Sequence, residues 1–223
     1  MLTVNTITKT FGHVTANDNI SFTVEHGEVF GLLGPNGSGK TTLISQMIGF
    51  MKPDEGNITI ANIDVIEKPD QARKLCSLQP QENISLSGLT PRQAIELTGR
   101  FRKGDRSFIR KRTNQLLHEL QIEKWADEAS ENLSGVVRRL VTFCMAIIVP
   151  GKLVILDEPT NDVDPIRRKL LWEQVRKVTN DGATVLLITH NVLEAEKSVD
   201  RLALINHGTL VGIGTPASLN GRF

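Results

Sequence analysis

The sequence predicts an α/β fold in which most strands form a parallel sheet. Three continuous apolar runs carry this prediction, because a strand buried on both faces reads as an unbroken apolar stretch rather than as an alternation. The runs are residues 29–33, 153–156 and 184–188. Stretches of helical character separate them, and crossover helices are what parallel strands require.

Two further segments predict β structure. Residues 20–24 alternate apolar and polar side chains, which predicts a half-buried strand ending in a turn at 25–28. Residues 205–210 read Ile-Asn-His-Gly-Thr-Leu and predict a β-hairpin.

The middle of the chain predicts helices. Thr90 is a candidate N-cap, with Pro91 at the first helical position and Gln93 three residues after the cap. A second helix is expected over residues 105–120, where apolar side chains fall on one stripe. That stripe consists of Phe108, Ile109, Leu116, Leu117 and Leu120. We interpret residues 83–150 as a helical insertion within a single domain spanning residues 1–223.

Composition limits the classes of function. A chain of 223 residues can bury one sizeable core, and a formal net charge of +1 gives no reason to expect nucleic acid or an anionic membrane surface as a partner. Residues 140–149 are apolar but shorter than the ~18 residues that cross a bilayer, so they predict a buried helix. Cys76 and Cys144 are expected to be buried, reduced thiols. With no secretion signal at its start, the chain is expected to be cytoplasmic.

A glycine-rich segment follows the apolar run at 29–33 and precedes a stretch with helical spacing. Residues 34–41 read Gly-Pro-Asn-Gly-Ser-Gly-Lys-Thr and fit the phosphate-loop pattern G-x-x-x-x-G-K-[ST]. Its glycines let backbone N–H groups turn toward phosphate oxygens, Lys40 reaches the β- and γ-phosphates, and Thr41 can ligate Mg²⁺. A ligand-free glycine turn is the alternative, which the strand–loop–helix order disfavours. The expected ATP-binding residues are Gly34, Pro35, Asn36, Gly37, Ser38, Gly39, Lys40, Thr41 and Thr42.

Two adjacent carboxylates follow the apolar run at 153–156. Asp157 stands at the carboxyl end of a predicted central strand, where it is suited to hold Mg²⁺ through its hydration shell. Glu158 comes one residue later and is a candidate general base for the attacking water. Acids that merely end a strand before Pro159 are the alternative, and the phosphate loop makes it the weaker one.

Further motifs stand in the order found in ABC ATPases, and the chain resembles that family over essentially its whole length. Gln81 is similar to the glutamine of the glutamine loop, and Leu-Ser-Gly at 133–135 begins the signature motif. Residues 161–164 resemble the D-loop and His190 the switch histidine. Phe11 matches the aromatic residue that stacks on adenine, although a core aromatic is the alternative there. Four histidines match no motif and are interpreted as surface or turn residues: His13, His26, His118 and His207. The basic run at 110–112 is interpreted as a solvated helix face.

The resemblance implies a phosphate-loop NTPase core with a mostly parallel sheet, an antiparallel β subdomain and a helical subdomain. It implies that Glu158, His190 and Gln81 act in ATP hydrolysis, with Thr41, Gln81 and Asp157 as Mg²⁺ ligands. Two such domains would pack head to tail as a homodimer or a heterodimer. Ser134 and Gly135 of one would contact the ATP of the other.

The family also implies a partner and a location. The ATPase would drive a transmembrane permease from the inner face of the membrane, and residues 189–196 look most like ATPases of bacterial exporters, including drug exporters. The signature usually continues Gly-Gln, whereas this chain has Val136 and Val137. A soluble ATP-dependent regulatory module with weak turnover is therefore the competing interpretation.

Overall fold

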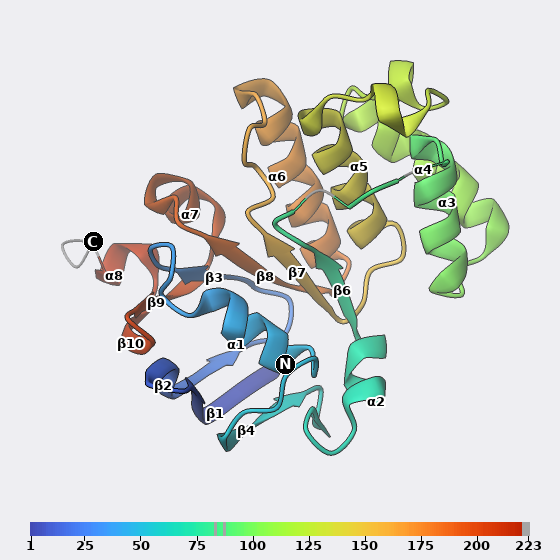
Figure 1. Cartoon of the computed structure of the whole chain (residues 1–223). Helices are drawn as coiled ribbons and strands as arrows, with labels where there is room; N and C mark the ends of the chain where they lie inside the picture. The colour runs from blue at the N-terminus through green and yellow to red at the C-terminus, as the bar shows by residue number, and fades with distance from the viewer. Residues whose placement is uncertain (83, 87, 220–223) are drawn as a thin grey trace. The chain divides into compact units, whose positions relative to one another are not determined.

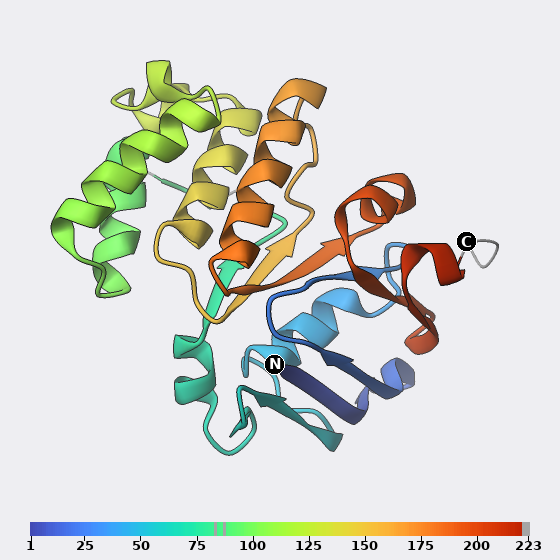
Figure 2. The same ribbon diagram turned by 180° about the vertical axis from the view of Figure 1, so that it is seen from behind.

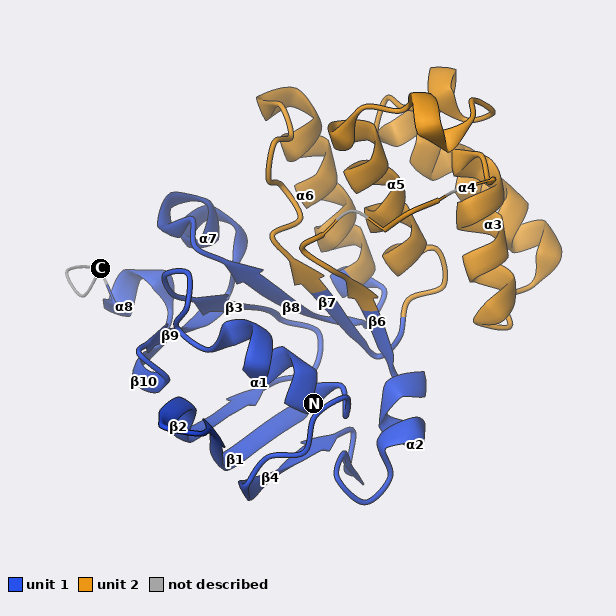
Figure 3. Cartoon of the chain, viewed as in Figure 1, with its two compact units in different colours: residues 1–77, 151–155, 179–223 blue, residues 78–150, 156–178 orange. Residues whose placement is uncertain are grey.

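The computed structural model of the chain describes residues 1–82, 84–86 and 88–219. Across these residues the strands pair into a four-stranded sheet, in the order β2-β1-β4-β5, and a six-stranded sheet, in the order β10-β9-β3-β8-β7-β6 (Figure 1). The chain divides into two compact units (Figure 3). Unit 1 comprises residues 1–77, 151–155 and 179–223, and unit 2 comprises residues 78–150 and 156–178. The predicted α/β class is confirmed.

The four-stranded sheet is antiparallel and belongs to unit 1. Strand β1 (Leu2–Phe11) pairs with β2 (Val14–Val24) on one side and with β4 (Glu55–Ile60) on the other, and β5 (Ile63–Asp64) follows β4. The strand predicted at 20–24 is the second half of β2. Its alternating burial continues the pattern read from the sequence.

The six-stranded sheet contains the three apolar runs. Strand β3 (Val29–Leu33) pairs in parallel with β8 (Thr184–Thr189) and with β9 (Arg201–Asn206). The order is completed by β7 (Leu153–Asp157), β6 (Cys76–Gln79) and β10 (Thr209–Gly214). Every residue of β3, β7 and β8 is buried, as unbroken apolar runs predict. The predicted hairpin is β9–β10, which turns at His207 and Gly208, both with positive φ.

Four helices of unit 1 are described, and the first of them matters most for the site. Helix α1 (Lys40–Met47) lies between β3 and the four-stranded sheet, as Figures 1 and 2 show from opposite sides. It buries Leu43, Ile44 and Met47, which supply the helical spacing seen in the sequence. The others are α2 (Pro69–Lys74), α7 (Val192–Ser198) and α8 (Pro216–Leu219).

Unit 2 holds the helices of the middle of the chain. They are α3 (Pro91–Phe101), α4 (Arg106–Glu119), η1 (Glu123–Trp125), η2 (Ser130–Asn132), α5 (Gly135–Ile147) and most of α6 (Pro165–Asn180). The predicted cap of α3 is present, because Gln93 N–H donates to Thr90 Oγ1 and Thr90 N–H donates to Gln93 Oε1. The insertion start predicted at residue 83 lies outside the described residues, and the single-domain assignment stays a prediction.

One side chain of the stripe predicted for α4 is exposed rather than buried. Ile109, Leu116, Leu117 and Leu120 are buried, but Phe108 is 51% exposed. It lies about 100° around the helix axis from Ile109, which takes it out of the buried arc. The prediction for Phe108 was therefore wrong.

The apolar segment at 140–149 and the cysteines behave largely as expected. Residues 140–147 form the buried end of α5, while Val149 lies beyond the helix. Cys76 and Cys144 are buried, and desolvation raises the pKa of the Cys144 thiol to about 12. No helix in the described ranges is both long and apolar enough to span a membrane.

Candidate nucleotide-binding site

The glycine-rich loop joins β3 to α1 in unit 1, and its backbone needs glycine at defined places. Gly37 has φ 79° and Gly39 has φ 98°, in the left-handed region that side chains disfavour. A Cβ at Gly34 would lie 2.1 Å from the carbonyl oxygen of Ile205, and one at Gly39 would lie 2.1 Å from that of Ala16. The path of this loop therefore excludes any side chain at positions 34 and 39.

Lys40 places its charge inside the loop. Its Nζ donates to the carbonyl oxygens of Gly34, at 2.6 Å, and Pro35, at 2.9 Å, and the residue is only 8% exposed. The Ser38 hydroxyl is buried and has no hydrogen-bond partner within the described part of the chain. A buried, unsatisfied hydroxyl costs ~1–3 kcal/mol, which an anion at the loop would relieve. Both features suit a phosphate group.

Two buried amides, which sequence reasoning missed, support the loop from behind. Asn17 on β2 is fully buried and donates from Nδ2 to Gly39 O at 3.1 Å. It accepts from Gln46 Nε2 at 2.7 Å, and Gln46 also donates to Thr42 O at 3.1 Å. The available signal was a glutamine on the apolar face of the predicted helix, beside Met47.

His190 and the start of the loop line one pocket of unit 1. His190 directly follows β8 and is exposed. The pocket has a volume of about 370 Å³ and is mostly apolar. Its lining is Leu33, Gly34, Pro35, His190, Val192, Leu204, Ile205, Asn206 and Val211. A polarisable imidazole is thus brought to the same hollow as the first residues of the phosphate loop.

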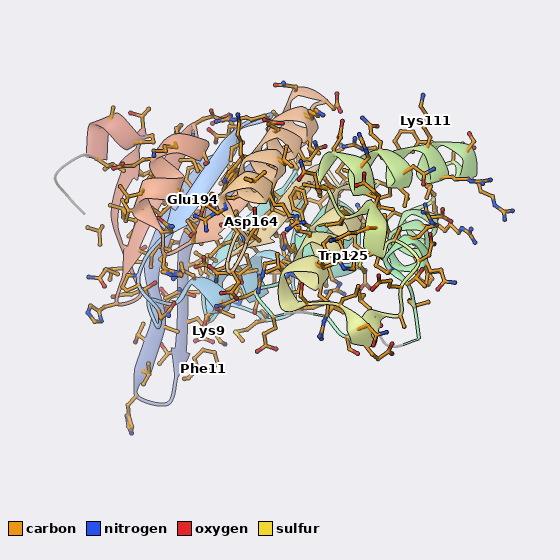
Figure 4. The ribbon with its side chains drawn as sticks, turned by 90° about the horizontal axis from the view of Figure 1, so that it is seen from above. Lys9, Phe11, Lys111, Trp125, Asp164 and Glu194 are labelled. Carbon is orange, nitrogen blue, oxygen red and sulfur yellow. The ribbon has the colours of Figure 1, made fainter. Side chains whose placement is uncertain are left out.

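Phe11 ends β1 and is 47% exposed, which rules out the core-aromatic alternative. The Nζ of Lys9 lies 5.6 Å from the centre of its ring, and both residues are labelled in Figure 4. The ring therefore remains accessible for stacking. The ammonium group of Lys9 makes a cation–π contact with this ring.

The two carboxylates belong to unit 2. Asp157 is the last residue of β7 and is 8% exposed, and Glu158 is 3% exposed. Glu158 has φ 48°, so the backbone leaves strand geometry at this residue. A non-glycine residue in that region costs ~1–3 kcal/mol and persists only when its surroundings hold it.

Arg139 holds this strained turn, and sequence reasoning missed it. Its guanidinium, on α5, donates from Nη1 to Glu158 O at 3.0 Å and from Nη2 to Gln81 O at 2.9 Å. Arg139 is 8% exposed, whereas Gln81 is exposed. One buried cation thus links the backbones of two predicted catalytic residues. The only hint in the sequence was a charge directly before the apolar run at 140–149.

The signature segment forms the start of α5. Ser134 is the N-cap, with its Oγ accepting from Val137 N–H at 3.3 Å, and both Ser134 and Gly135 are exposed. Val136 is half-buried, and Val137 is 2% exposed. Val137 is therefore a core residue of unit 2. Val136 alone adds a branched side chain to the partly open first turn.

The segment 161–164, predicted to be the D-loop, leads into α6 through a carboxylate that accepts backbone hydrogen bonds at the start of this helix. Asp164 Oδ1 accepts from the N–H groups of Ile166 and Arg167, each at 3.1 Å. These bonds hold the pKa of Asp164 below its usual range, the bond from Arg167 N–H contributing most. Asp164, labelled in Figure 4, therefore stays ionised and holds the segment after residues 161–163.

Comparisons with known proteins identify the family. A family model described as "ABC transporter" matches residues 17–161. The chain is 35% identical, over 98% of its length and 68% of the relative's, to the Nod factor export ATP-binding protein I of Ralstonia nicotianae. The chain belongs to the ABC transporter family.

Other relatives of this ABC ATPase agree. The Nod factor export ATP-binding protein I of Rhizobium meliloti is 37% identical over 97% of the chain, which spans 64% of that relative's length. A solved structure described as the ATP-binding subunit of an ABC transporter matches 100% of the chain and 93% of its own, with a TM-score of 0.92 and 26% identity. A nucleotide-free ATP-binding cassette matches 96% of the chain and 91% of its own, with a TM-score of 0.82 and 26% identity.

These findings confirm the predicted family, its fold, and its role as the ATP-binding, ATP-hydrolysing subunit of a transporter. The predicted site residues are divided between the units of this ABC ATPase. Unit 1 holds Phe11, the loop at 34–42 and His190, and unit 2 holds Gln81, Ser134, Gly135, Asp157 and Glu158. In the described ranges no three His, Cys, Asp or Glu side chains gather as a metal cluster.

Proposed function

We propose that this ABC ATPase powers an exporter whose membrane-spanning permease is a separate chain. The observation that carries the proposal is similarity along nearly the whole chain, 35% over 98% of it, to a protein named as an export ATP-binding protein. The geometry of the phosphate loop supports it, because positions 34 and 39 tolerate only glycine and the loop encloses the Lys40 cation. The subunit would work from the inner face of the membrane.

In unit 1 we propose that the loop at 34–42 binds the phosphates of ATP and that Phe11 stacks on adenine. Lys40 supplies the positive charge for the β- and γ-phosphates. Base stacking on an aromatic ring contributes ~1–3 kcal/mol, and the exposed ring of Phe11 has the open face that this needs. His190 contacts the γ-phosphate.

In unit 2 we propose that Glu158 is the general base and that Gln81 helps to position the attacking water. Mg²⁺ accompanies the nucleotide, with Thr41, Gln81 and Asp157 as its ligands. Mg²⁺ characteristically combines one or two carboxylates with phosphate oxygens and waters.

We propose that two copies, or this chain and a related partner, pack head to tail around ATP. Ser134 and Gly135 are exposed at the N-terminus of α5, where backbone N–H groups and the helix dipole favour an anion. Val136 is half-buried and adds a branched side chain to this turn, where a nucleotide of the partner would approach the backbone. That observation favours a second candidate function, a regulatory ATP-dependent module with weak turnover.

The two candidates differ in their dependence on a permease. The test looks in the neighbouring reading frame for a polytopic membrane protein, co-expresses the chain with it, and measures co-purification and ATPase rate, with Mg²⁺ and with chelator. If the chain is the motor of an exporter, it co-purifies with that membrane protein. It then hydrolyses ATP only with Mg²⁺, and the membrane protein raises its ATPase rate. Hydrolysis without any association assigns the regulatory role instead.

A further inference from the structure

The turn between α3 and α4 concentrates positive charge. Residues 100–112, which we call the basic turn, hold seven basic side chains and one acidic side chain, in a chain whose formal net charge is +1. The sequence alone suggested a solvated helix face for part of it. The structure adds two observations that a solvated face does not explain.

The first observation is that four cations of the basic turn lack a carboxylate partner. Arg100 pairs with Glu96 at 3.6 Å and Arg112 with Glu119 at 3.7 Å. Among the described residues no carboxylate pairs with the remaining exposed cations, which are Lys103, Arg106, Arg110 and Lys111.

The one acid of the basic turn is committed to the backbone. Asp105 Oδ1 accepts from the N–H groups of Ser107 and Phe108, each at 2.9 Å, and so caps α4. Its carboxylate therefore compensates the helix terminus rather than the neighbouring guanidinium groups.

The second observation is that two phenylalanines point outward among these cations. Phe101, the last residue of α3, is 79% exposed, and Phe108, in the first turn of α4, is 51% exposed. Phe108 and Lys111 are three residues apart on α4 and so lie side by side on its surface. Figure 4 shows Lys111 on the outer side of this helix.

The outward face of α4 carries exposed side chains, among them Arg106, Arg110 and Lys111. The helix is held by its opposite face, where Ile109, Thr113, Leu116 and Leu117 are buried. Beside the cations lies a wide, open hollow rather than a groove. Its lining is Asp105, Arg106, Ser107, Arg110, Lys111 and Asn114.

We propose that the basic turn binds the surface of an anionic lipid bilayer. Clustered Lys and Arg side chains attract anionic headgroups. Exposed aromatic rings, here those of Phe101 and Phe108, can enter the boundary between headgroups and acyl chains. An extended acidic peptide would need a groove to order its backbone, and the open hollow offers none. A broad anionic surface matches both the positive charge of the basic turn and the open shape of the hollow beside it.

Contact with lipid would act beside the permease and independently of it. Unit 2 would then have an attachment of its own to the membrane surface. Because the basic turn contains none of the residues assigned to ATP, weakening it leaves nucleotide binding unchanged.

The test is flotation of the full chain with vesicles, either pure phosphatidylcholine or phosphatidylcholine containing phosphatidylglycerol. We expect binding to the anionic vesicles only, weakened when salt rises from about 0.05 M to about 0.5 M. Each cation is worth about fivefold in affinity, so the combined variant R106Q/R110Q/K111Q should bind about 10²-fold more weakly. The variant F101S/F108S should lose the binding that survives high salt.

A matched control removes the same charge elsewhere. Lys68, Lys74 and Lys152 are exposed residues of unit 1, and K68Q/K74Q/K152Q should keep nearly all vesicle binding. ATP affinity and the thermal unfolding midpoint show that each variant is folded. Three results overturn the proposal: equal binding to both vesicle types, equal loss in the control, or no binding by the wild-type chain. The last of these would assign the basic turn to an acidic protein segment.

Discussion

The phosphate loop in unit 1 and the carboxylate turn in unit 2 are held in very different ways. The loop is fixed by close backbone approaches at Gly34 and Gly39, by the buried pair Asn17 and Gln46, and by Lys40. Several independent contacts therefore hold the loop, and the loss of one leaves the others in place.

The carboxylate turn is held at its backbone, where the N–H group of Asn161 donates to the carbonyl oxygen of Glu158 at 3.3 Å. Glu158 has a positive φ, and the guanidinium of Arg139 ties its carbonyl oxygen to that of Gln81. Strain at a catalytic residue is kept only where other contacts hold it. We therefore expect nucleotide binding to tolerate the loss of a single contact behind the loop, and catalysis to respond to the loss of the Arg139 guanidinium, which ties the backbones of Glu158 and Gln81.

The largest effect is expected at the carboxylate itself. Glu158→Gln should lower hydrolysis by about 10²–10⁴-fold while ATP still binds, because a general base contributes on that scale. Arg139 holds the carbonyl oxygen of Glu158 and not its carboxylate, so the turn should keep its shape. Steady-state ATPase assays and size-exclusion chromatography with ATP and Mg²⁺ measure the rate and the expected ATP-bound dimers. Unchanged turnover would move the role of base to another residue, with His190 next.

The corresponding change in the loop removes its charge. Lys40→Ala should weaken ATP binding by about 10²–10⁴-fold, since charge-assisted hydrogen bonds contribute ~1.5–3 kcal/mol each and the lysine serves two phosphates. Nucleotide titration of the purified chain measures the affinity. Affinity like that of the wild type would contradict the assigned loop chemistry.

Arg139→Met tests the dependence on one side chain. It should lower kcat by about 10–10²-fold with little change in ATP affinity, because misplacing a catalytic group by about 1 Å can cost ~10²-fold. Arg139→Lys keeps the charge but cannot bridge both carbonyl oxygens, so it should rescue only in part. The thermal unfolding midpoint separates loss of position from loss of folding. An equal fall in ATP affinity would show that the turn also supports binding.

Val136→Gly probes the first turn of α5. Glycine should raise the ATPase rate by up to about tenfold, because removing the branched side chain allows closer backbone approach to the partner's nucleotide. The rate as a function of enzyme concentration, with and without permease, is the measurement. A rate unchanged in every condition would mean that valine is tolerated there.

The smallest effect is expected behind the loop. Asn17→Ala should change ATP affinity by less than about fivefold, because one neutral hydrogen bond contributes ~1 kcal/mol and Gln46 still bonds to Thr42 O. Nucleotide titration beside Lys40→Ala gives the comparison directly. A loss as large as that of the lysine variant would refute redundancy in the loop.

What the sequence by itself determined was local. The apolar runs of β3, β7 and β8, the capping box at Thr90 and the order of strand, glycine loop and helix all depend on neighbouring residues. Side-chain period and the special conformations of glycine act over a few positions, so they can be read directly from the chain. They were sufficient to predict the fold class, whereas the family was predicted from the order of motifs that the chain shares with ABC ATPases.

What only the tertiary structure decided were contacts between distant residues. Arg139 reaches a carbonyl 58 positions away at Gln81, and Asn17 reaches one 22 positions away at Gly39. Stripe reasoning also placed Phe108 in the core, although packing against α4 needed only the arc around Ile109 and left the ring exposed. A buried polar side chain is stable only when a partner meets it, and the partner is chosen by how remote segments pack.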